Sequence, residues 1–276
     1  MARMSEGADE ALLVRLDRVS MAYGRGETAV RAIQDVSLEI AKGELIAVVG
    51  PSGCGKSSLM KLVSGLHPPL AGTLTVENRP VTGPLKSVGM AFQNSNLLPW
   101  RNAVDNVLLP LEIVQPHRRR IGSHRAEYRE KAVKLLESVG LAGAAEKFPW
   151  ELSGGMQQRT SICRALIHEP EILMLDEPFG ALDAFTREEL WCTLRDLHAA
   201  RKVTVMHVTH DLREAVFLAD TVYVMSGHPG RIIRRRAVDI PKPRDLEVTY
   251  TQRFQDIVHE LRALIGRGGA PGAQAR

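Results

Sequence analysis

The chain has 276 residues, enough for one large domain or two small ones, and its 44% hydrophobic and 25% charged residues are typical of a soluble globular protein. Its 36 basic and 32 acidic side chains leave a net charge of +4, which is too mild for a protein devoted to nucleic acid. Three widely spaced cysteines without a C-x-x-C pair argue against a disulfide framework and a structural zinc site. Every apolar run is far shorter than the ~20 residues that span a bilayer, and we expect no targeting segment.

The first third of the chain is predicted to form strands and one helix. Residues 12–20 and 29–40 carry alternating or β-branched apolar side chains, which favours two strands. Residues 44–49 form a continuous apolar run before a glycine-rich loop, which indicates a buried parallel strand. A helix is expected over 56–64, with Gly65 ending it. Further strands are expected at 73–77 and 87–92.

The middle of the chain, from about 101 to 168, has the pattern of helices. Ala132, Leu135, Leu136 and Val139 recur there at helical spacing among charged residues. Beyond it, buried strands are expected at 172–175, 203–208 and 222–225, and helices near 186–200 and 212–219. This order predicts an α/β core with a helical subdomain. The last ten residues, rich in glycine and alanine, are expected to form a disordered tail.

The segment from Gly50 to Ser57 matches the pattern G-x-x-x-x-G-K-[ST] between a predicted strand and a predicted helix. Its glycines let backbone N–H groups curl around phosphate oxygens, and the helix directs its positive end at the same anion. Lys56 is expected to reach the β- and γ-phosphates, and the Ser57 hydroxyl to bind Mg²⁺. A plain glycine turn does not explain this strand–loop–helix context. The candidate nucleotide-binding residues are Gly50, Pro51, Ser52, Gly53, Cys54, Gly55, Lys56, Ser57 and Ser58.

Two adjacent carboxylates follow the predicted strand 172–175. Asp176 stands at the carboxyl end of the strand, where open α/β sheets bind ligands, and is expected to hold Mg²⁺ through water. Glu177 is placed to polarise the attacking water as general base. Alone, the two carboxylates are equally explained as polar residues at a strand end. Together with the phosphate loop they predict a nucleoside triphosphatase.

Cys54 lies inside the phosphate loop, close to Lys56 and to a predicted helix N-terminus. Such surroundings lower the pKa of a thiol and raise its reactivity. We therefore expect alkylation of Cys54 to block nucleotide binding, and bound nucleotide with Mg²⁺ to protect the thiol.

The stretch Leu152-Ser-Gly-Gly-Met-Gln-Gln-Arg159 places Ser-Gly-Gly before a helix and so offers a second helix N-terminus to an anion. It resembles the signature sequence of the ATP-binding cassette (ABC) ATPases. Four further residues resemble motifs of this family, in the family's order. Tyr23 resembles the aromatic residue that stacks on adenine, and Gln93 resembles the Q-loop glutamine that touches Mg²⁺ and water. Asp183 resembles the D-loop aspartate, and His210 resembles the switch histidine. Taken singly, each has another explanation: Tyr23 can pack on the strand pair, Gln93 can be a solvated loop residue, and a lone histidine such as His210 is more often structural than catalytic.

The resemblance implies an α/β fold in which a P-loop NTPase core carries an antiparallel β subdomain and a helical subdomain at about 94–168. It covers residues 11–240 and leaves 241–276 as an amphipathic helix and tail. The apolar positions of that helix are Phe254, Ile257, Leu261 and Ile265. The implied Mg²⁺ ligands are Ser57, Gln93 and Asp176, and the implied catalytic residues are Glu177, His210 and Gln93.

The resemblance also implies a homodimer whose two domains pair head to tail. Each ATP then lies between the phosphate loop of one chain and the signature of the other, and binding of ATP closes the pair. The residues implied to touch the partner's ATP are Ser153, Gly154, Gly155 and Gln157.

Three interpretations of the physiological role remain open. A chain without membrane helices suits an importer, in which the ATPase pair works with two transmembrane permease subunits and, indirectly, a solute-binding protein. A separately encoded exporter ATPase and a soluble ABC ATPase outside transport are the alternatives. The segments 97–107, 180–190 and 224–232 resemble the nitrate, sulfonate and taurine importer subfamily. That resemblance implies a place on the cytoplasmic face of the inner membrane and no nucleic-acid partner, while the transported solute is not encoded in this chain.

Two further features have two interpretations each. The Leu-Leu-Pro-Trp segment 97–100 follows Gln93, and it either docks on a permease or belongs to the core of the helical subdomain. The basic clusters 117–120 and 234–236 either attract anionic lipid or are solvated surface charge, which is the plainer explanation.

Overall fold

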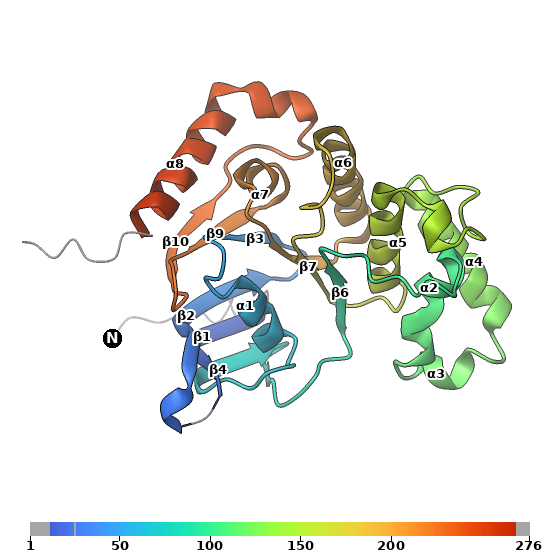
Figure 1. Ribbon diagram of the computed structural model, residues 1–276, viewed down its shortest axis with the longest axis horizontal. Coiled ribbons are helices and arrows are strands. Elements are labelled where there is room, and N and C mark those ends of the chain that lie inside the picture. Colours follow the sequence, from blue (N-terminus) through green and yellow to red (C-terminus); the bar gives the residue numbers. More distant parts are fainter. Residues whose placement is uncertain (1–11, 25, 269–276) are drawn as a thin grey trace, which may run out of the picture. The chain divides into compact units, whose positions relative to one another are not determined.

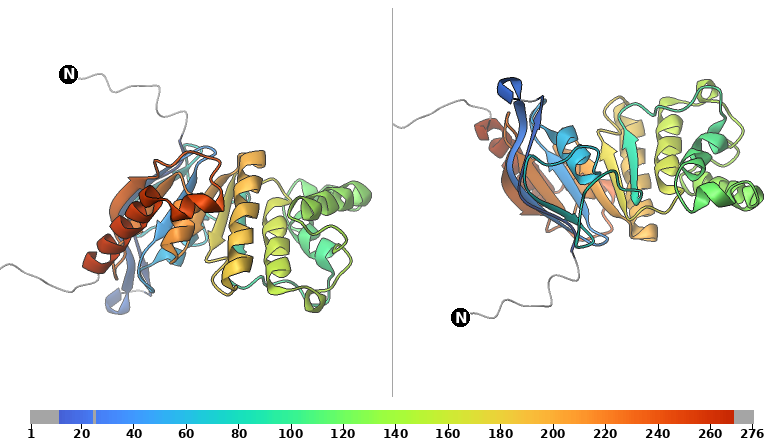
Figure 2. Two further views of the ribbon diagram at one scale, coloured as in Figure 1. Left: turned by 90° about the horizontal axis from the view of Figure 1, so that it is seen from above. Right: turned by 90° about the horizontal axis from the view of Figure 1, so that it is seen from below.

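The computed structural model describes residues 12–24 and 26–268, which form two compact units (Figures 1 and 2). Unit one consists of the described residues up to Leu85, of Val208–Lys242 and of those from Val248 onward. Unit two consists of Lys86–His207 and Pro243–Glu247. The chain therefore builds the first part of unit one, then nearly all of unit two, and then returns to unit one.

Unit one contains a four-stranded antiparallel sheet in the order β2-β1-β4-β5. Its strands are β1 (Leu12–Tyr23), β2 (Val30–Ala41), β4 (Ala71–Val76) and β5 (Arg79–Pro80), and the 3₁₀ turn Gly26–Thr28 precedes β2. In β2, buried Val36, Leu38 and Ile40 alternate with exposed residues, as expected of a strand with one solvated face. The predicted strands near 12–20, 29–40 and 73–77 are confirmed, and β1 continues as far as Tyr23.

A second group of strands in unit one leads into the glycine-rich loop. β3 (Leu45–Val49) runs parallel to β9 (Thr221–Met225), which pairs antiparallel with β10 (Ile232–Ala237). Every residue of β3 and β9 is buried, which confirms the predicted buried parallel strand. The helix α1 (Lys56–Val63) follows the loop, and Gly65 ends it with φ of 73°, as predicted.

The C-terminal helix α8 (Gln252–Gly268) follows the 3₁₀ turn Leu246–Tyr250. It contacts α7 (Leu212–Leu218) and β9 within unit one. Its buried side chains are Phe254, Ile257 and Leu261, and Ile265 is half-buried. One side of α8 therefore covers the core of the unit. The expected disordered tail falls almost entirely on residues 269–276, which lie outside the described residues.

Unit two is built on the strands β8, β7 and β6 in that order. Their bounds are Thr204–Val208 for β8, which ends at the boundary of the unit, Ile172–Asp176 for β7 and Val88–Phe92 for β6. β6 and β7 are parallel, with Val88 opposite Ile172 and Phe92 opposite Asp176. These strands confirm the predictions for 87–92, 172–175 and 203–208.

The helices of unit two are α2 (Ala103–Leu108), α3 (His117–Arg120), α4 (Arg125–Ser138), α5 (Gly154–Leu166) and α6 (Ala184–Arg201), with 3₁₀ turns at Leu109–Glu112 and Pro149–Glu151. α5 contacts α2, α4, α6 and β6, and Figure 2 shows α5 and α6 side by side. The predicted helix-rich stretch 101–168 is therefore present. The limits of a helical subdomain at about 94–168 stay a prediction, because unit two also contains β6, β7, β8 and α6.

A substitution at Gly89 tests the close packing of β6 against α5. A Cβ atom at this position would overlap the carbonyl oxygen of Ala165, so Gly89→Ala must displace the backbone of the strand or the helix. We expect a loss of about 1–3 kcal/mol in the free energy of unfolding. Gly122→Ala is the control, because a Cβ atom there meets nothing within 4 Å. Urea unfolding compares the two variants, and equal midpoints would contradict the close packing.

Candidate functional site

The glycine-rich loop of unit one runs from Gly50 to Gly55, between β3 and α1 (Figure 1). Gly55 has φ of 100° at the start of α1, and a Cβ atom there would lie 2.7 Å from the carbonyl oxygen of Ala32. Only glycine satisfies both conditions. Nζ of Lys56 donates hydrogen bonds to the carbonyl oxygens of Gly50 at 3.0 Å and Pro51 at 3.1 Å. The loop thus brings backbone N–H groups, a helix N-terminus and one ammonium group together, which suits a polyphosphate.

A second segment of unit one packs against this loop and was missed by the sequence reasoning. Gly230 follows β9, and a Cβ atom there would overlap the carbonyl oxygen of Cys54. The Gly230 N–H donates to the carbonyl of Ala32 at 3.0 Å, and its own carbonyl accepts from the N–H of Gln34 at 2.9 Å. The available signal was the pair of glycines in Gly227-His-Pro-Gly230 after a buried strand, which is typical of a close backbone approach.

The expectation of a reactive Cys54 is wrong. Only 1% of the residue is exposed, and a Cβ atom on Gly50 would lie 2.9 Å from its Sγ. Reactive cysteines combine a thiolate-stabilising field with partial exposure, and Cys54 lacks the exposure. Its side chain belongs to the packing beneath the loop, a property that proximity to Lys56 in sequence does not reveal.

Tyr23 ends β1 and is connected to α1. Its hydroxyl lies 3.1 Å from Oγ of Ser58, and Nζ of Lys61 donates to the same hydroxyl at 3.3 Å. The ring packs edge-on against His67 and remains 38% exposed. A cavity of about 530 Å³ is lined by both neighbours of Tyr23 and by the segment after α1: Ala22, Gly24, His67, Pro68, Pro69 and Leu70. The structure therefore brings Tyr23 and Ser58, both predicted to bind nucleotide, into contact.

His210 lies at the same end of β3 as the phosphate loop. The N–H of Thr209 donates to the carbonyl of Val48 at 3.2 Å, two residues before Gly50. His210 itself is exposed. Asp211 then caps α7 by accepting hydrogen bonds from two backbone N–H groups of its first turn. Local capping and pairing therefore fix the backbone on both sides of His210.

In unit two, the pairing of β6 with β7 brings Gln93 and the two carboxylates to one edge. Because Phe92 is opposite Asp176, Gln93 and Glu177 are the next residues of two adjacent parallel strands. Gln93 is exposed, whereas Asp176 and Glu177 are half-buried. Glu177 has φ of 47°, an uncommon left-handed conformation that turns the chain directly after the strand. This carboxyl edge is where parallel sheets bind ligands.

The signature segment begins α5, next to the predicted D-loop residue. Oγ of Ser153 accepts a hydrogen bond from the first turn and caps the helix. Gly154 is exposed, and a Cβ atom on Gly155 would lie 2.6 Å from Cγ2 of Thr186. Asp183 caps α6 by accepting from the N–H of Thr186 at 3.0 Å, and this hydrogen bond lowers the pKa of its carboxyl. The signature and D-loop residues thus lie at the N-termini of two packed helices.

Gln157, which is expected to touch the partner's ATP, makes hydrogen bonds within unit two. Its Nε2 donates to the carbonyls of Pro149 at 2.9 Å and Leu152 at 3.2 Å, and its Oε1 accepts from Oγ of Ser95 at 3.1 Å. Both amide N–H groups are thus used within unit two, while Oε1 keeps a second lone pair that can accept a hydrogen bond. Contact of Gln157 with the partner's ATP stays a prediction.

The donor atoms predicted for Mg²⁺ fit that ion. A hydroxyl from Ser57, a carboxylate from Asp176 and an amide oxygen from Gln93 are hard oxygen ligands. Mg²⁺ is commonly bound by one or two protein groups together with water and substrate phosphates, without a protein cage. The described part of the chain contains no cluster of three or more His, Cys, Asp or Glu side chains able to hold a metal ion.

Comparison with known proteins places the chain in a family. The profile described as ABC transporter matches residues 33–180, more than half of the chain. The taurine import ATP-binding protein of Yersinia pestis bv. Antiqua is 46% identical over 208 residues, which cover 75% of this chain and 79% of that protein. The aliphatic sulfonates import ATP-binding protein of Bacillus licheniformis is 43% identical over 223 residues, which cover 81% and 84%.

A solved structure agrees with these relatives. A dimeric ATP-binding cassette in a post-hydrolysis state, bound to ADP and Pi, matches with a TM-score of 0.68 and 30% identity. The match covers 83% of this chain and all of that one. The family resemblance seen in the sequence is thereby confirmed, as is the predicted fold. The chain belongs to the ABC transporter family and is an ATPase with the fold of its ATP-binding cassettes.

Proposed function

We propose that this ATPase energises an importer for a small solute of the nitrate, sulfonate and taurine class. The support for import comes from the relatives, whose names refer to taurine and aliphatic sulfonates import. The observation that carries the hydrolytic role is the register of β6 and β7, which aligns Gln93 with Asp176 and Glu177 at one edge of unit two. The choice of solute belongs to other subunits of such a system.

In this proposal the phosphate loop and Lys56 bind the triphosphate of ATP, and Tyr23 stacks on the adenine. The exposed ring of Tyr23 next to a cavity supports its role. Ser57, Gln93 and Asp176 hold Mg²⁺, which when bound neutralises charge on the β- and γ-phosphates. The oxygen chemistry of these three side chains supports that assignment.

Hydrolysis is assigned to Glu177 and His210, with Gln93 orienting the water. Glu177 takes a proton from the attacking water, a role worth ~10²–10⁴ in rate for a positioned base. Its place directly after β7, fixed by an unusual backbone turn, supports a defined direction of the carboxylate. His210 stands on a backbone fixed by Thr209 and Asp211, which suits a group that senses the γ-phosphate.

The working state is proposed to be a homodimer in which Ser153, Gly154 and Gly155 face the ATP of the partner chain. Their position at the N-terminus of α5, where Ser153 and Gly154 are exposed, supports anion contact. Asp183 caps the adjacent helix, next to the signature, and is assigned to the same interface. The related cassette solved as a dimer with ADP and Pi supports the pairing.

The proposed partners are two permease subunits at the cytoplasmic face of the inner membrane and, through them, a solute-binding protein. Within residues 12–24 and 26–268, no helix combines the length and apolarity needed to cross a bilayer. Trp100 is 72% exposed, while Leu97 and Leu98 are half-buried. The indole therefore supports docking on a permease, and the two leucines support packing of the loop beneath it.

The two basic clusters differ in their contacts. In β10, Arg235 donates to the Tyr223 hydroxyl at 3.2 Å, and Arg236 pairs with Glu260 at 3.1 Å. The cluster on α3, Arg118–Arg120, is exposed and has no ion-pair partner among the residues that the structure describes. α3 therefore offers more free guanidinium groups to anionic lipid than β10 does, while solvated surface charge stays the plainer explanation of both clusters.

Reconstitution tests the import proposal directly. The chain is combined in proteoliposomes with the permease pair of its transport system. ATP is sealed inside, the binding protein and labelled taurine, an alkanesulfonate or nitrate are added outside, and uptake is measured. We expect ATP-dependent uptake of one of these solutes, and none with the Glu177→Gln variant. Export of preloaded solute, or ATPase activity that no permease stimulates, would refute the proposal.

Two substitutions separate binding from turnover. Lys56→Ala is expected to weaken ATP binding at least about tenfold, because a charge-assisted hydrogen bond contributes ~1.5–3 kcal/mol. Glu177→Gln is expected to keep ATP binding and lower kcat by ~10²–10⁴, because the amide keeps the shape but cannot act as base. Titration calorimetry, single-turnover hydrolysis and gel filtration with ATP measure these effects. Lys42→Ala, an exposed lysine of unit one, is the control. Wild-type hydrolysis by Glu177→Gln, or its failure to dimerise with ATP, would contradict the assignment.

A mixed dimer tests whether the signature serves the partner's ATP. One chain carries Lys56→Ala and the other Ser153→Arg, both with Glu177→Gln to trap nucleotide. If each site joins one phosphate loop to the other chain's signature, one site of the mixed dimer receives both defects and the second receives none. Each homodimer should then trap little ATP, whereas the mixed dimer should trap one ATP.

The two chains carry different tags, so that nucleotide is counted on isolated mixed dimers only. If the signature served the phosphate loop of its own chain, both sites of the mixed dimer would remain damaged. Absence of rescue, with mixed dimers shown to form, would end the proposal of a shared site.

A further inference from the structure

The residue before Gln93 is held by α5. Nε2 of Gln158, a residue only 3% exposed, donates to the carbonyl oxygen of Phe92 at 2.8 Å. The strand that ends at Phe92 also meets α5 at Gly89, where a Cβ atom would overlap the carbonyl oxygen of Ala165. Close packing and a buried hydrogen bond therefore anchor the N-terminal side of Gln93 to α5.

Arg164, near the other end of α5, holds the C-terminal side of Gln93. Its Nη2 donates to the carbonyl of Ser95 at 2.6 Å and its Nη1 to the carbonyl of Asn96 at 2.8 Å. A planar guanidinium can bind two consecutive carbonyls at once, which an ammonium group cannot copy. Asn96 has φ of 48°, so the backbone is held in a left-handed conformation. Only Gln93 and Asn94 lie between the anchored carbonyls.

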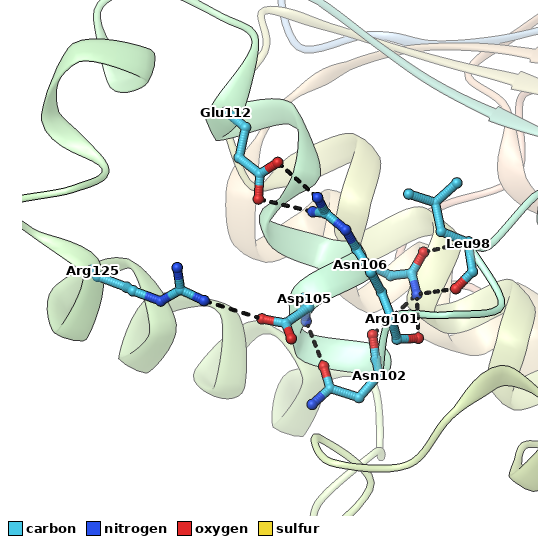
Figure 3. A network of polar contacts seen from close by, with 7 residues as sticks. All are labelled: Leu98, Arg101, Asn102, Asp105, Asn106, Glu112 and Arg125. Carbon is cyan, nitrogen blue, oxygen red and sulfur yellow. Dashed lines mark hydrogen bonds and ion pairs between the residues drawn. The ribbon is translucent and has the colours of Figure 1, made fainter.

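The same segment continues into a loop that is also held from within unit two (Figure 3). Asn106, fully buried, accepts from the N–H of Leu98 at 2.7 Å and donates to the carbonyls of Leu98 and Arg101. Arg101 in turn makes two hydrogen bonds to Glu112, at 2.8 and 3.0 Å. Trp100 is thus exposed on a loop whose backbone is fixed on both sides.

We propose that Arg164 is a positioning residue that fixes Gln93 to α5. Gln93, the signature Ser153 at the start of α5 and the loop with Trp100 then move as one body. The inference rests on the proposed function, because it takes Gln93 as the residue that contacts Mg²⁺ and water. If Arg164 only stabilised the fold by satisfying carbonyls, its loss would lower stability without acting through Gln93.

Arg164→Met removes both donors and keeps an apolar stem of similar length. We expect kcat to fall about tenfold, because small misplacements of a catalytic group cost one to two orders of magnitude. ATP affinity should change less than about twofold, since the phosphate loop belongs to unit one. Arg164→Lys keeps the charge and one hydrogen bond and should retain more activity than Arg164→Met.

A double-mutant cycle shows whether the effect passes through Gln93. In a Gln93→Ala background, Arg164→Met should lower kcat no further, because the residue that it positions is gone. Arg159→Met is the matched control: Arg159 lies on the same helix but pairs with Glu189 at 3.0 Å. Arg159→Met and Gln93→Ala should act independently, so that the fold reductions in kcat of the two single variants multiply in the double variant. The proposal would be overturned if the reductions in kcat caused by Arg164→Met and Gln93→Ala multiplied in the double variant, or if Arg164→Met did not lower kcat at all.

Hydrogen exchange of the nucleotide-free protein gives a readout that does not depend on ATPase activity. In Arg164→Met, amides of residues 93–97 should exchange about fivefold faster or more, with the amide of Leu98, which Asn106 holds, and peptides of 50–58 and 172–176 unchanged. Faster exchange throughout the chain would mean a purely structural role, and unchanged exchange at 93–97 would refute the anchoring. A wild-type protein without ATPase activity would instead refute the proposed function, while this measurement would still decide the role of Arg164.

Discussion

The parallel pairing of β6 with β7 is the contact on which the chemistry of unit two depends. With Phe92 opposite Asp176, the first residues beyond the two strands are Gln93 and Glu177. A slip of one residue would turn every side chain of β6 to the other face and move Gln93 away from the carboxylates. Gly89 and Ala91 are the buried residues of β6, and their small size lets α5 approach the strand.

The helix α5 holds the segment around Gln93 as part of one rigid element. It has 13 residues, and at about 1.5 Å per residue it is about 20 Å long. Ser153 caps its N-terminus, while Gln158 and Arg164 hold the segment around Gln93 from its middle and its end. A single rigid helix thereby connects a proposed anion site to a proposed Mg²⁺ ligand without an intervening flexible linker.

In unit one the phosphate loop depends on backbone contacts made far away in sequence. The turn at Gly55 is locally encoded, but the carbonyl of Cys54 packs against Gly230, which arrives from the other end of the chain. Ala32 receives a hydrogen bond from Gly230 and lies against Gly55, so three distant segments meet beneath the loop. Burial of Cys54 and of Lys56 follows from this packing.

The sequence by itself determined the parts whose geometry is local. The loop from Gly50 to Ser57, the strand ending in Asp176 and the cap at Ser153 are set by glycine conformations, apolar runs and capping side chains within a few residues. Only the tertiary structure decided that Cys54 is buried, that the Gln157 side chain makes hydrogen bonds within unit two and that Arg164 holds the backbone beside Gln93. These properties arise from contacts between segments tens of residues apart or more. Sequence spacing does not report such contacts, because packing and hydrogen-bond partners are chosen only when the elements meet.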